Sequence, residues 1–233
     1  MKEQHIIIKN NKGQNLAGFF YENRLDTLII FCHGTDSFSQ HLESMQPFIR
    51  AYYGLGISLF FFDFTGYGKS EGKGVFNHSQ RVYDIGSVVA HFRGTYKKII
   101  LCGVSLGVIA ATIAAITYKE ITKLYLVNGY YYLRFTSPRF YLMIFFGFLF
   151  NKEVREESLY AWKNLHYEKI TIPTLIVVGE KDQIVNPKQS ITFYNQLKCK
   201  KQLLVVPNGD HALLDPKYIP KYFPTVKQWI LEK

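Results

Sequence analysis

The sequence has few cysteines, and their positions exclude two kinds of site. Only three of its 233 residues are cysteine, at positions 32, 102 and 199. Three scattered cysteines cannot build a disulfide framework, and they lack the paired spacing of a zinc site. Cys32 and Cys102 lie in apolar runs, where a free cysteine behaves as a small hydrophobic residue. We therefore expect a reducing, cytoplasmic location, and no bound metal or other cofactor.

Long hydrophobic runs are also missing. The longest apolar stretch, FYLMIFFGFLF at 140–150, is far shorter than the roughly 20 residues that span a bilayer. The only apolar run near the N-terminus ends after three isoleucines at 6–8, which is too short for a secretory signal. The sequence therefore predicts a soluble protein.

A concentrated basic segment is missing as well, although the formal net charge is +10. Lysine and arginine are dispersed along the chain, and no nucleic-acid-binding motif accompanies them. A dispersed excess of lysine is typical of a solvated surface. We expect no nucleic-acid partner.

Apolar segments of strand length are what the sequence does contain. From the third segment onward they are continuous β-branched and aromatic runs, as in parallel strands that are buried on both faces. Helix-prone stretches alternate with them, which favours an α/β fold with a mostly parallel sheet. The first two segments have no helix between them and are expected to pair as an antiparallel hairpin at one edge. The predicted strands cover 5–9, 16–22, 27–33, 58–64, 98–104, 123–129, 174–180 and 202–208.

The alternation is interrupted once, at about 130–166. An aromatic, apolar block is followed there by a polar, helix-prone segment. This insertion is too long for an ordinary connection between two sheet strands, and it predicts a lid or cap. Neither a linker nor an internal repeat is evident, so we expect residues 1–233 to form a single domain.

The segment GVSLG (103–107) places Ser105 between two glycines, directly after a predicted strand and directly before a predicted helix. G-x-S-x-G in this context is the pattern of a nucleophile elbow, in which a strained turn exposes the serine hydroxyl at the carboxyl end of the sheet. The helix N-terminus behind it would present free N–H groups to a developing oxyanion. Ser105 is therefore the candidate nucleophile.

A serine nucleophile needs a base and a group that orients the base, and both follow downstream. Asp182 comes just after the seventh predicted strand and His211 just after the eighth. The carboxyl ends of parallel strands meet at one edge, so the three side chains should converge there. Asp63, which follows the fourth strand, is a rival for the acid. Asp182 is favoured because it lies after the serine in the chain.

These residues together give the chain a resemblance to the α/β-hydrolase superfamily, over essentially the whole sequence. It looks most like small lipases and esterases, including monoglyceride-lipase-like and acyl-protein-thioesterase-like members. FCHGTDS (31–37) matches the His-Gly that follows the third strand of that family. The resemblance implies that the backbone N–H groups of Thr35 and Leu106 form the oxyanion hole. It also implies an eight-stranded sheet with helices on both faces and a short cap after the sixth strand.

The predicted activity is hydrolysis of carboxylic esters that carry a hydrophobic acyl group, through a Ser-His-Asp triad and an acyl-enzyme. A thioesterase with the same triad is the nearest alternative. A peptidase is less favoured, because no acidic cluster is evidently placed to hold a substrate amine. A non-catalytic binding protein on this fold is less favoured, because no triad member is missing. Phe145 and Phe146, in the aromatic block, are predicted to line the acyl site. The same block is a candidate for peripheral contact with a membrane.

Overall fold

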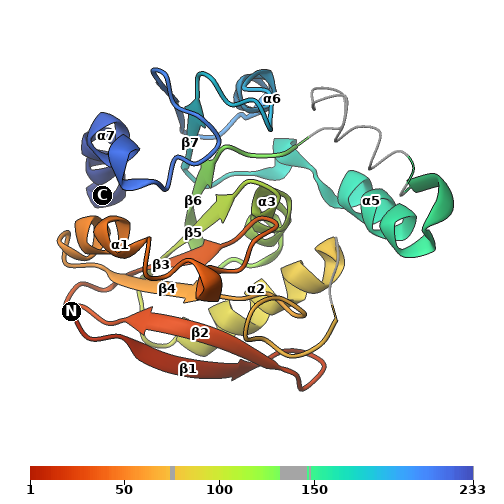
Figure 1. The fold of residues 1–233 in the computed structure, drawn as a ribbon, viewed down its shortest axis with the longest axis horizontal. Coiled ribbons are helices and arrows are strands. Elements are labelled where there is room, and N and C mark those ends of the chain that lie inside the picture. Colours follow the sequence, from red (N-terminus) through yellow and green to blue (C-terminus); the bar gives the residue numbers. More distant parts are fainter. Residues whose placement is uncertain (74–76, 132–145, 147, 233) are drawn as a thin grey trace.

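The structure is a computed structural model that describes residues 1–73, 77–131, 146 and 148–232 (Figure 1). The described residues form an eight-stranded sheet in the order β1-β2-β4-β3-β5-β6-β7-β8. Pairing is antiparallel between β1 and β2 and between β2 and β4, and parallel elsewhere. The strands are β1 Gln4–Lys9, β2 Asn15–Tyr21, β3 Thr27–Cys32, β4 Ser58–Phe62, β5 Lys98–Val104, β6 Ile121–Val127, β7 Thr174–Gly179 and β8 Lys201–Val206.

The central strands are apolar along their whole length because both faces of the sheet are covered. Every residue of β4 and β7 is buried, as is all of β3 except its first residue. The edge strand β1 instead alternates between more and less exposed residues. The predicted mostly parallel α/β sheet with an antiparallel edge hairpin is confirmed.

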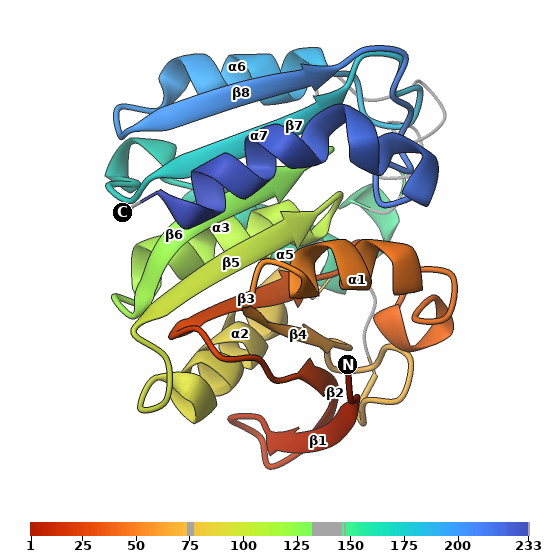
Figure 2. The same ribbon diagram turned by 90° about the vertical axis from the view of Figure 1, so that its left-hand side faces the viewer.

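Helices cover both faces of this sheet (Figure 2). Helices α1 and α7 pack on one face, where their aromatic side chains join one core cluster. Helices α2, α3, α5 and α6 lie on the other face and contribute to a second cluster. Their bounds are α1 Gln46–Tyr53, α2 His78–Phe92, α3 Gly107–Thr117, α5 Lys152–Asn164, α6 Lys188–Gln196 and α7 Ile219–Leu231.

Strands β4, β6 and β8 each end two residues earlier than the sequence predicts, and for β4 and β6 the reason is local. Strand β6 ends at Val127 because Asn128 takes a left-handed conformation, with a φ of 46°. Strand β4 ends at Phe62 because the carboxylate of Asp63 turns to accept backbone N–H groups from Ser39 and Lys69. Both interruptions lie at the carboxyl edge, where the chain leaves the sheet to build loops.

The insertion between β6 and β7 contains α5 and a 3₁₀ turn at Tyr167–Lys169. Helix α5 packs against α2 and α3, yet large apolar side chains in and before it face solvent. Phe146 is 53% exposed, Phe150 80% and Trp162 83%. Within the described part of the chain, no helix has the length and apolar character needed to cross a bilayer.

Candidate active site

Ser105 lies in a tight turn between β5 and α3. Its φ of 51° is unusual for a residue with a side chain, and such strain collects at functional sites. The glycines on either side allow close packing. A Cβ on Gly103 would lie 2.8 Å from the Cβ of Ala111 in α3, and one on Gly107 would lie 2.4 Å from the carbonyl oxygen of His33. The turn therefore leaves no space for a Cβ at either glycine.

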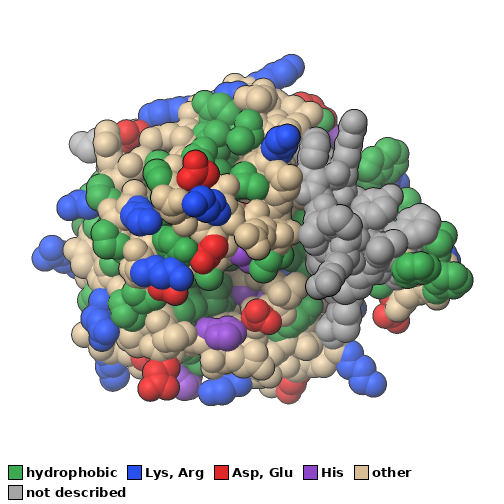
Figure 3. Space-filling view, turned by 45° about the horizontal axis from the view of Figure 1, so that its top comes forward, with side chains coloured by type: hydrophobic (Ala, Val, Ile, Leu, Met, Phe, Trp, Pro, Cys, Tyr) green, Lys and Arg blue, Asp and Glu red, His purple; other side chains and the backbone are tan. Residues whose placement is uncertain are grey.

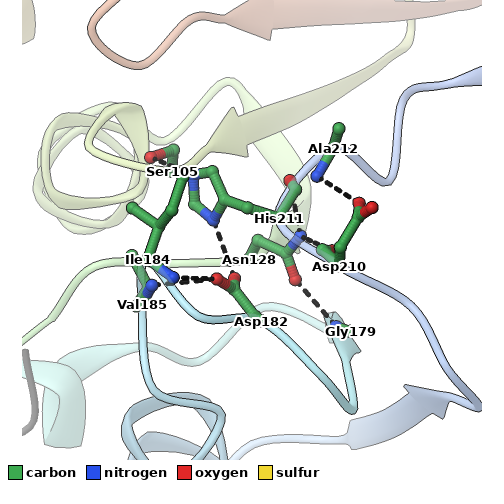
Figure 4. Close-up of polar contacts among 9 residues, drawn as sticks. All are labelled: Ser105, Asn128, Gly179, Asp182, Ile184, Val185, Asp210, His211 and Ala212. Carbon is green, nitrogen blue, oxygen red and sulfur yellow. Dashed lines mark hydrogen bonds and ion pairs between the residues drawn. The ribbon is translucent and has the colours of Figure 1, made fainter. Parts of the chain in front are cut away.

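The three side chains proposed as a triad meet at the carboxyl edge of the sheet (Figure 4). The Nε2 atom of His211 lies 3.0 Å from the Oγ of Ser105, and its Nδ1 lies 2.7 Å from Oδ2 of Asp182. Asp182 comes from the loop after β7 and His211 from the loop after β8. A hydroxyl, an imidazole and a carboxylate within hydrogen-bond reach can move the serine proton to the histidine.

The carboxylate of Asp182 is fixed by its other oxygen. Oδ1 accepts the backbone N–H groups of Ile184 and Val185, both at 2.9 Å, and the side chain is fully buried. This leaves Oδ2 directed at the imidazole. Asp63, the rival acid, accepts the backbone N–H of Ser39, in the loop after β3, and that of Lys69, in the loop after β4, and is not a hydrogen-bond partner of His211.

The loop after β3 lies beside Ser105. A Cβ on Gly34 would lie 2.9 Å from the Cβ of Ser105, so a larger residue would not fit without movement. Thr35 and Leu106 both line the cavity in front of the serine. Among the described residues, neither the Thr35 N–H nor the Leu106 N–H has a hydrogen-bond partner. Two free N–H groups beside a nucleophile can bind an oxyanion.

His33 supports this loop. Its Nε2 accepts the N–H of Phe64 at 2.9 Å, so Nδ1 carries the proton and donates to the carbonyl oxygen of Gly34 at 3.1 Å. Burial, and then the nearby charge of Arg81, lower the pKa of His33 to about 3, which keeps the ring neutral. The ring therefore acts as a fixed hydrogen-bonding group and holds the loop.

A cavity of about 490 Å³ opens in front of Ser105 and His211. Figure 3 shows a hollow on this face with histidine and hydrophobic side chains around it, while lysines and arginines are scattered over the surface. Apolar side chains from several loops form much of the wall: Phe38, Met45, Val127, Tyr130, Ile184, Val185, Leu213 and Leu214. The space next to the nucleophile is therefore suited to an apolar group.

The structure describes only one of the two phenylalanines predicted to line an acyl site. Phe145 lies outside the described residues. Phe146 stacks on Phe150 with ring centroids 6.2 Å apart, and it does not belong to the described cavity wall. Across the described segments, no group of three His, Cys, Asp or Glu side chains is arranged to hold a metal ion.

Asn128 was not singled out from the sequence, yet its side chain connects the end of β7 to the loop that carries His211 (Figure 4). Its Nδ2 donates to the carbonyl oxygens of Asp210 and His211, at 3.0 and 2.8 Å, and its Oδ1 accepts the N–H of Gly179 at 2.8 Å. The only sequence signal is that Asn128 is polar and stands near the carboxyl end of the apolar run predicted as the strand 123–129.

Comparison with protein families gives a match to the model described as an alpha/beta hydrolase domain, over residues 25–221. A protein of Saccharomyces cerevisiae, named as an uncharacterized membrane protein, is 24% identical over 219 residues. That match covers 91% of this chain and 73% of the yeast protein.

Solved structures share the fold at low sequence identity. The Pyrococcus furiosus esterase Pf2001 has a TM-score of 0.75 and 22% identity, with 98% of this chain and 90% of that one covered. Est1E from Butyrivibrio proteoclasticus, with ferulic acid bound, has a TM-score of 0.77 and 20% identity over 97% and 98% of the two chains. The Paleococcus ferrophilus monoacylglycerol lipase has a TM-score of 0.72 and 17% identity over 99% and 98%.

Proposed function

Because the chain belongs to the alpha/beta hydrolase family, we propose that it is a serine hydrolase that cleaves carboxylic esters with a hydrophobic acyl group. The observation that carries the proposal is the continuous hydrogen-bonded series from Ser105 through His211 to Asp182. The names of two solved structures with this fold, the Pyrococcus furiosus esterase Pf2001 and the Paleococcus ferrophilus monoacylglycerol lipase, agree with it.

In the proposed mechanism, His211 removes the hydroxyl proton of Ser105 as Oγ attacks the acyl carbonyl. Asp182 keeps the imidazole in the tautomer with its proton on Nδ1 and stabilises the imidazolium that forms. The N–H groups of Thr35 and Leu106 stabilise the negative charge on the former carbonyl oxygen. His211 then protonates the leaving group, and water hydrolyses the acyl-enzyme with the same residue as base.

The apolar wall of the cavity supports a hydrophobic acyl chain. Phe38, Met45 and Leu213 are buried side chains at its surface. Each methylene that leaves water adds roughly 0.8 kcal/mol of binding, so kcat/KM should rise with chain length until the cavity is full.

The exposed apolar side chains of the cap support peripheral contact with a membrane. Trp162 and Phe150 are each at least 80% exposed, and a tryptophan and a phenylalanine in this position suit a lipid interface. A cytoplasmic protein of this kind would reach a lipid ester from the surface of the bilayer.

The test is a series of p-nitrophenyl esters from acetate to palmitate, with an octanoyl thioester assayed beside the octanoyl ester. We expect kcat/KM to increase from acetate to octanoate. Faster turnover of the thioester would favour the thioesterase alternative, and no turnover of either would contradict the proposal.

A matched pair of substitutions locates the acyl chain. Met45→Ser should lower the preference for octanoate over acetate by about 10-fold, since it places a polar group in the cavity wall. Phe146→Ser, which alters an exposed side chain of the cap, should leave that preference within about 2-fold of the native value. The reverse pattern would assign the acyl chain to the aromatic block.

A further inference from the structure

Arg81 is a buried cation whose charge the proposed mechanism does not use. It lies in the first turns of α2, is only 2% exposed, and is among the largest fully buried side chains. None of the ion pairs between described residues involves it. Burial lowers the pKa of Arg81, and the buried carboxylate of Asp84, on the same helix, acts to raise it without forming an ion pair with Arg81. The groups that the guanidinium contacts directly are therefore informative.

Those partners are two carbonyl oxygens of the loop after β3. Nη2 donates to the oxygen of Gly34 at 2.9 Å, and Nη1 donates to that of His33 at 3.2 Å. The guanidinium also lies over the rings of Phe64 and Tyr67, 4.8 Å from each centroid. The planar fork of arginine is therefore held between aromatic faces and aimed at the loop beside Ser105.

The carbonyl of Gly34 shares its peptide unit with the N–H of Thr35. The chain has no cis peptide among its described residues, and in a planar trans peptide the C=O and N–H bonds point in opposite directions. Two donors, Nη2 of Arg81 and Nδ1 of His33, fix the Gly34 oxygen on the protein side. The Thr35 N–H must then point the other way, and Thr35 lies on the cavity side.

Without those donors, little would hold this peptide in one orientation. Glycine rotates freely about its backbone bonds, so a change at Gly34 could turn the C=O into the cavity and the N–H away from it. A carbonyl there would repel the oxyanion. A cation on the carbonyl side also polarises the peptide and strengthens the N–H as a donor, more so in a buried region of low dielectric.

We propose that Arg81 is a positioning residue for the oxyanion hole: its guanidinium fixes and polarises the Gly34–Thr35 peptide so that the Thr35 N–H faces the reacting carbonyl. The inference rests on the proposed function of Ser105. It predicts that Arg81 acts on the transition state, in which the oxyanion exists, and has little effect on ground-state binding of an ester.

The experiment compares Arg81→Met and Arg81→Lys with the native protein and with Val88→Ala. Val88 is fully buried in the same helix, and its side chain cannot hydrogen-bond to the loop, so Val88→Ala controls for lost packing. We expect Arg81→Met to lower kcat about 10- to 100-fold and to change KM less than about 3-fold. This loss of kcat is somewhat smaller than the loss caused by removing a group that donates directly to the oxyanion. Arg81→Lys retains the charge without the fork and should fall between Arg81→Met and native.

A pair of inhibitors separates positioning from stability. An alkyl trifluoromethyl ketone forms a hemiketal oxyanion with the serine, whereas the alcohol of the same chain length does not. Affinity for the ketone should fall by about the same factor as kcat in both Arg81 variants, and affinity for the alcohol should not change. Val88→Ala should lower the melting temperature without altering either affinity.

Equal kcat in native protein and a folded Arg81 variant would overturn the inference, as would equal loss of affinity for ketone and alcohol. If Arg81→Met does not fold, Arg81→Lys decides by the same measurements. Failure of the native protein to hydrolyse any ester or bind the ketone would instead overturn the proposed function, and with it this inference.

Discussion

The candidate site has two halves, and each is held by a different kind of buried polar side chain. The nucleophile half consists of Ser105 and the loop after β3 that contains Gly34 and Thr35. It lies over the central strands β3 and β5 and is held by the cation Arg81. The acid–base half, with Asp182 and His211, is carried by the loops after β7 and β8 and is held by the neutral amide of Asn128.

The difference in charge suits the chemistry on each side. In the proposed mechanism, negative charge develops on the acyl oxygen beside the nucleophile half, where a buried cation is favourable. Positive charge develops on the imidazole of His211, where a cation beneath its loop would raise the energy of the imidazolium. A neutral anchor fixes the same kind of loop geometry without that penalty. The two halves therefore require different anchors.

The largest effect is expected from the acid–base half itself. Asp182→Asn should lower kcat by about 10⁴-fold, because an amide facing Nδ1 favours the wrong imidazole tautomer. Steady-state kinetics with a soluble ester, on protein with a native circular dichroism spectrum, measures this.

Asp63→Asn is the matched control, because Asp63 accepts the backbone N–H groups of Ser39 and Lys69 and does not hydrogen-bond to His211. It should lower the melting temperature more than it lowers kcat of the folded fraction. A large kcat loss for Asp63→Asn with little loss for Asp182→Asn would assign the triad acid to Asp63.

A smaller effect is expected from the anchor of that half. Asn128→Ala removes the bonds to the carbonyls of Asp210 and His211, and it leaves the N–H of Gly179 without its partner. A shift of about 1 Å in a catalytic group can cost about 100-fold, so kcat should fall by about 10- to 100-fold. The unfolding free energy should also fall by about 1–3 kcal/mol.

Asn208→Ala controls for the backbone strain in this variant. Asn208 also has a left-handed φ, of 55°, but it is exposed and its side chain does not bridge the catalytic loops. It should cost about 1 kcal/mol of stability and leave kcat unchanged. If the two variants lost activity equally, the strain and not the bridge would be responsible.

Much of the fold could be predicted from the sequence, because parallel strands buried on both faces give continuous apolar runs. The tight turn at Ser105 could also be predicted, because close contacts leave no space for a Cβ at Gly103 or Gly107. Asp182 and His211 were found by combining chain order with the shared edge of the sheet.

The two anchoring side chains, Arg81 and Asn128, could not be predicted from strand patterns or chain order. Arg81 and Asp84 lie three residues apart on α2, and such a pair usually indicates a solvated face. Here that face is buried, because Asp84 binds Thr65 and Asn10 while Arg81 binds the loop after β3. Burial of this kind depends on loops distant in sequence, and so does the use of Asn128.

Labelling with a fluorophosphonate, followed by peptide mapping, tests the central claim most directly. A single modification on the peptide that contains Ser105 is predicted, and Ser105→Ala should abolish it. Ser44→Ala removes another hydroxyl of the same cavity wall and should label at the native rate. Modification of a different residue, undiminished labelling of Ser105→Ala, or no labelling of the native protein would contradict the assignment of Ser105 as an activated nucleophile.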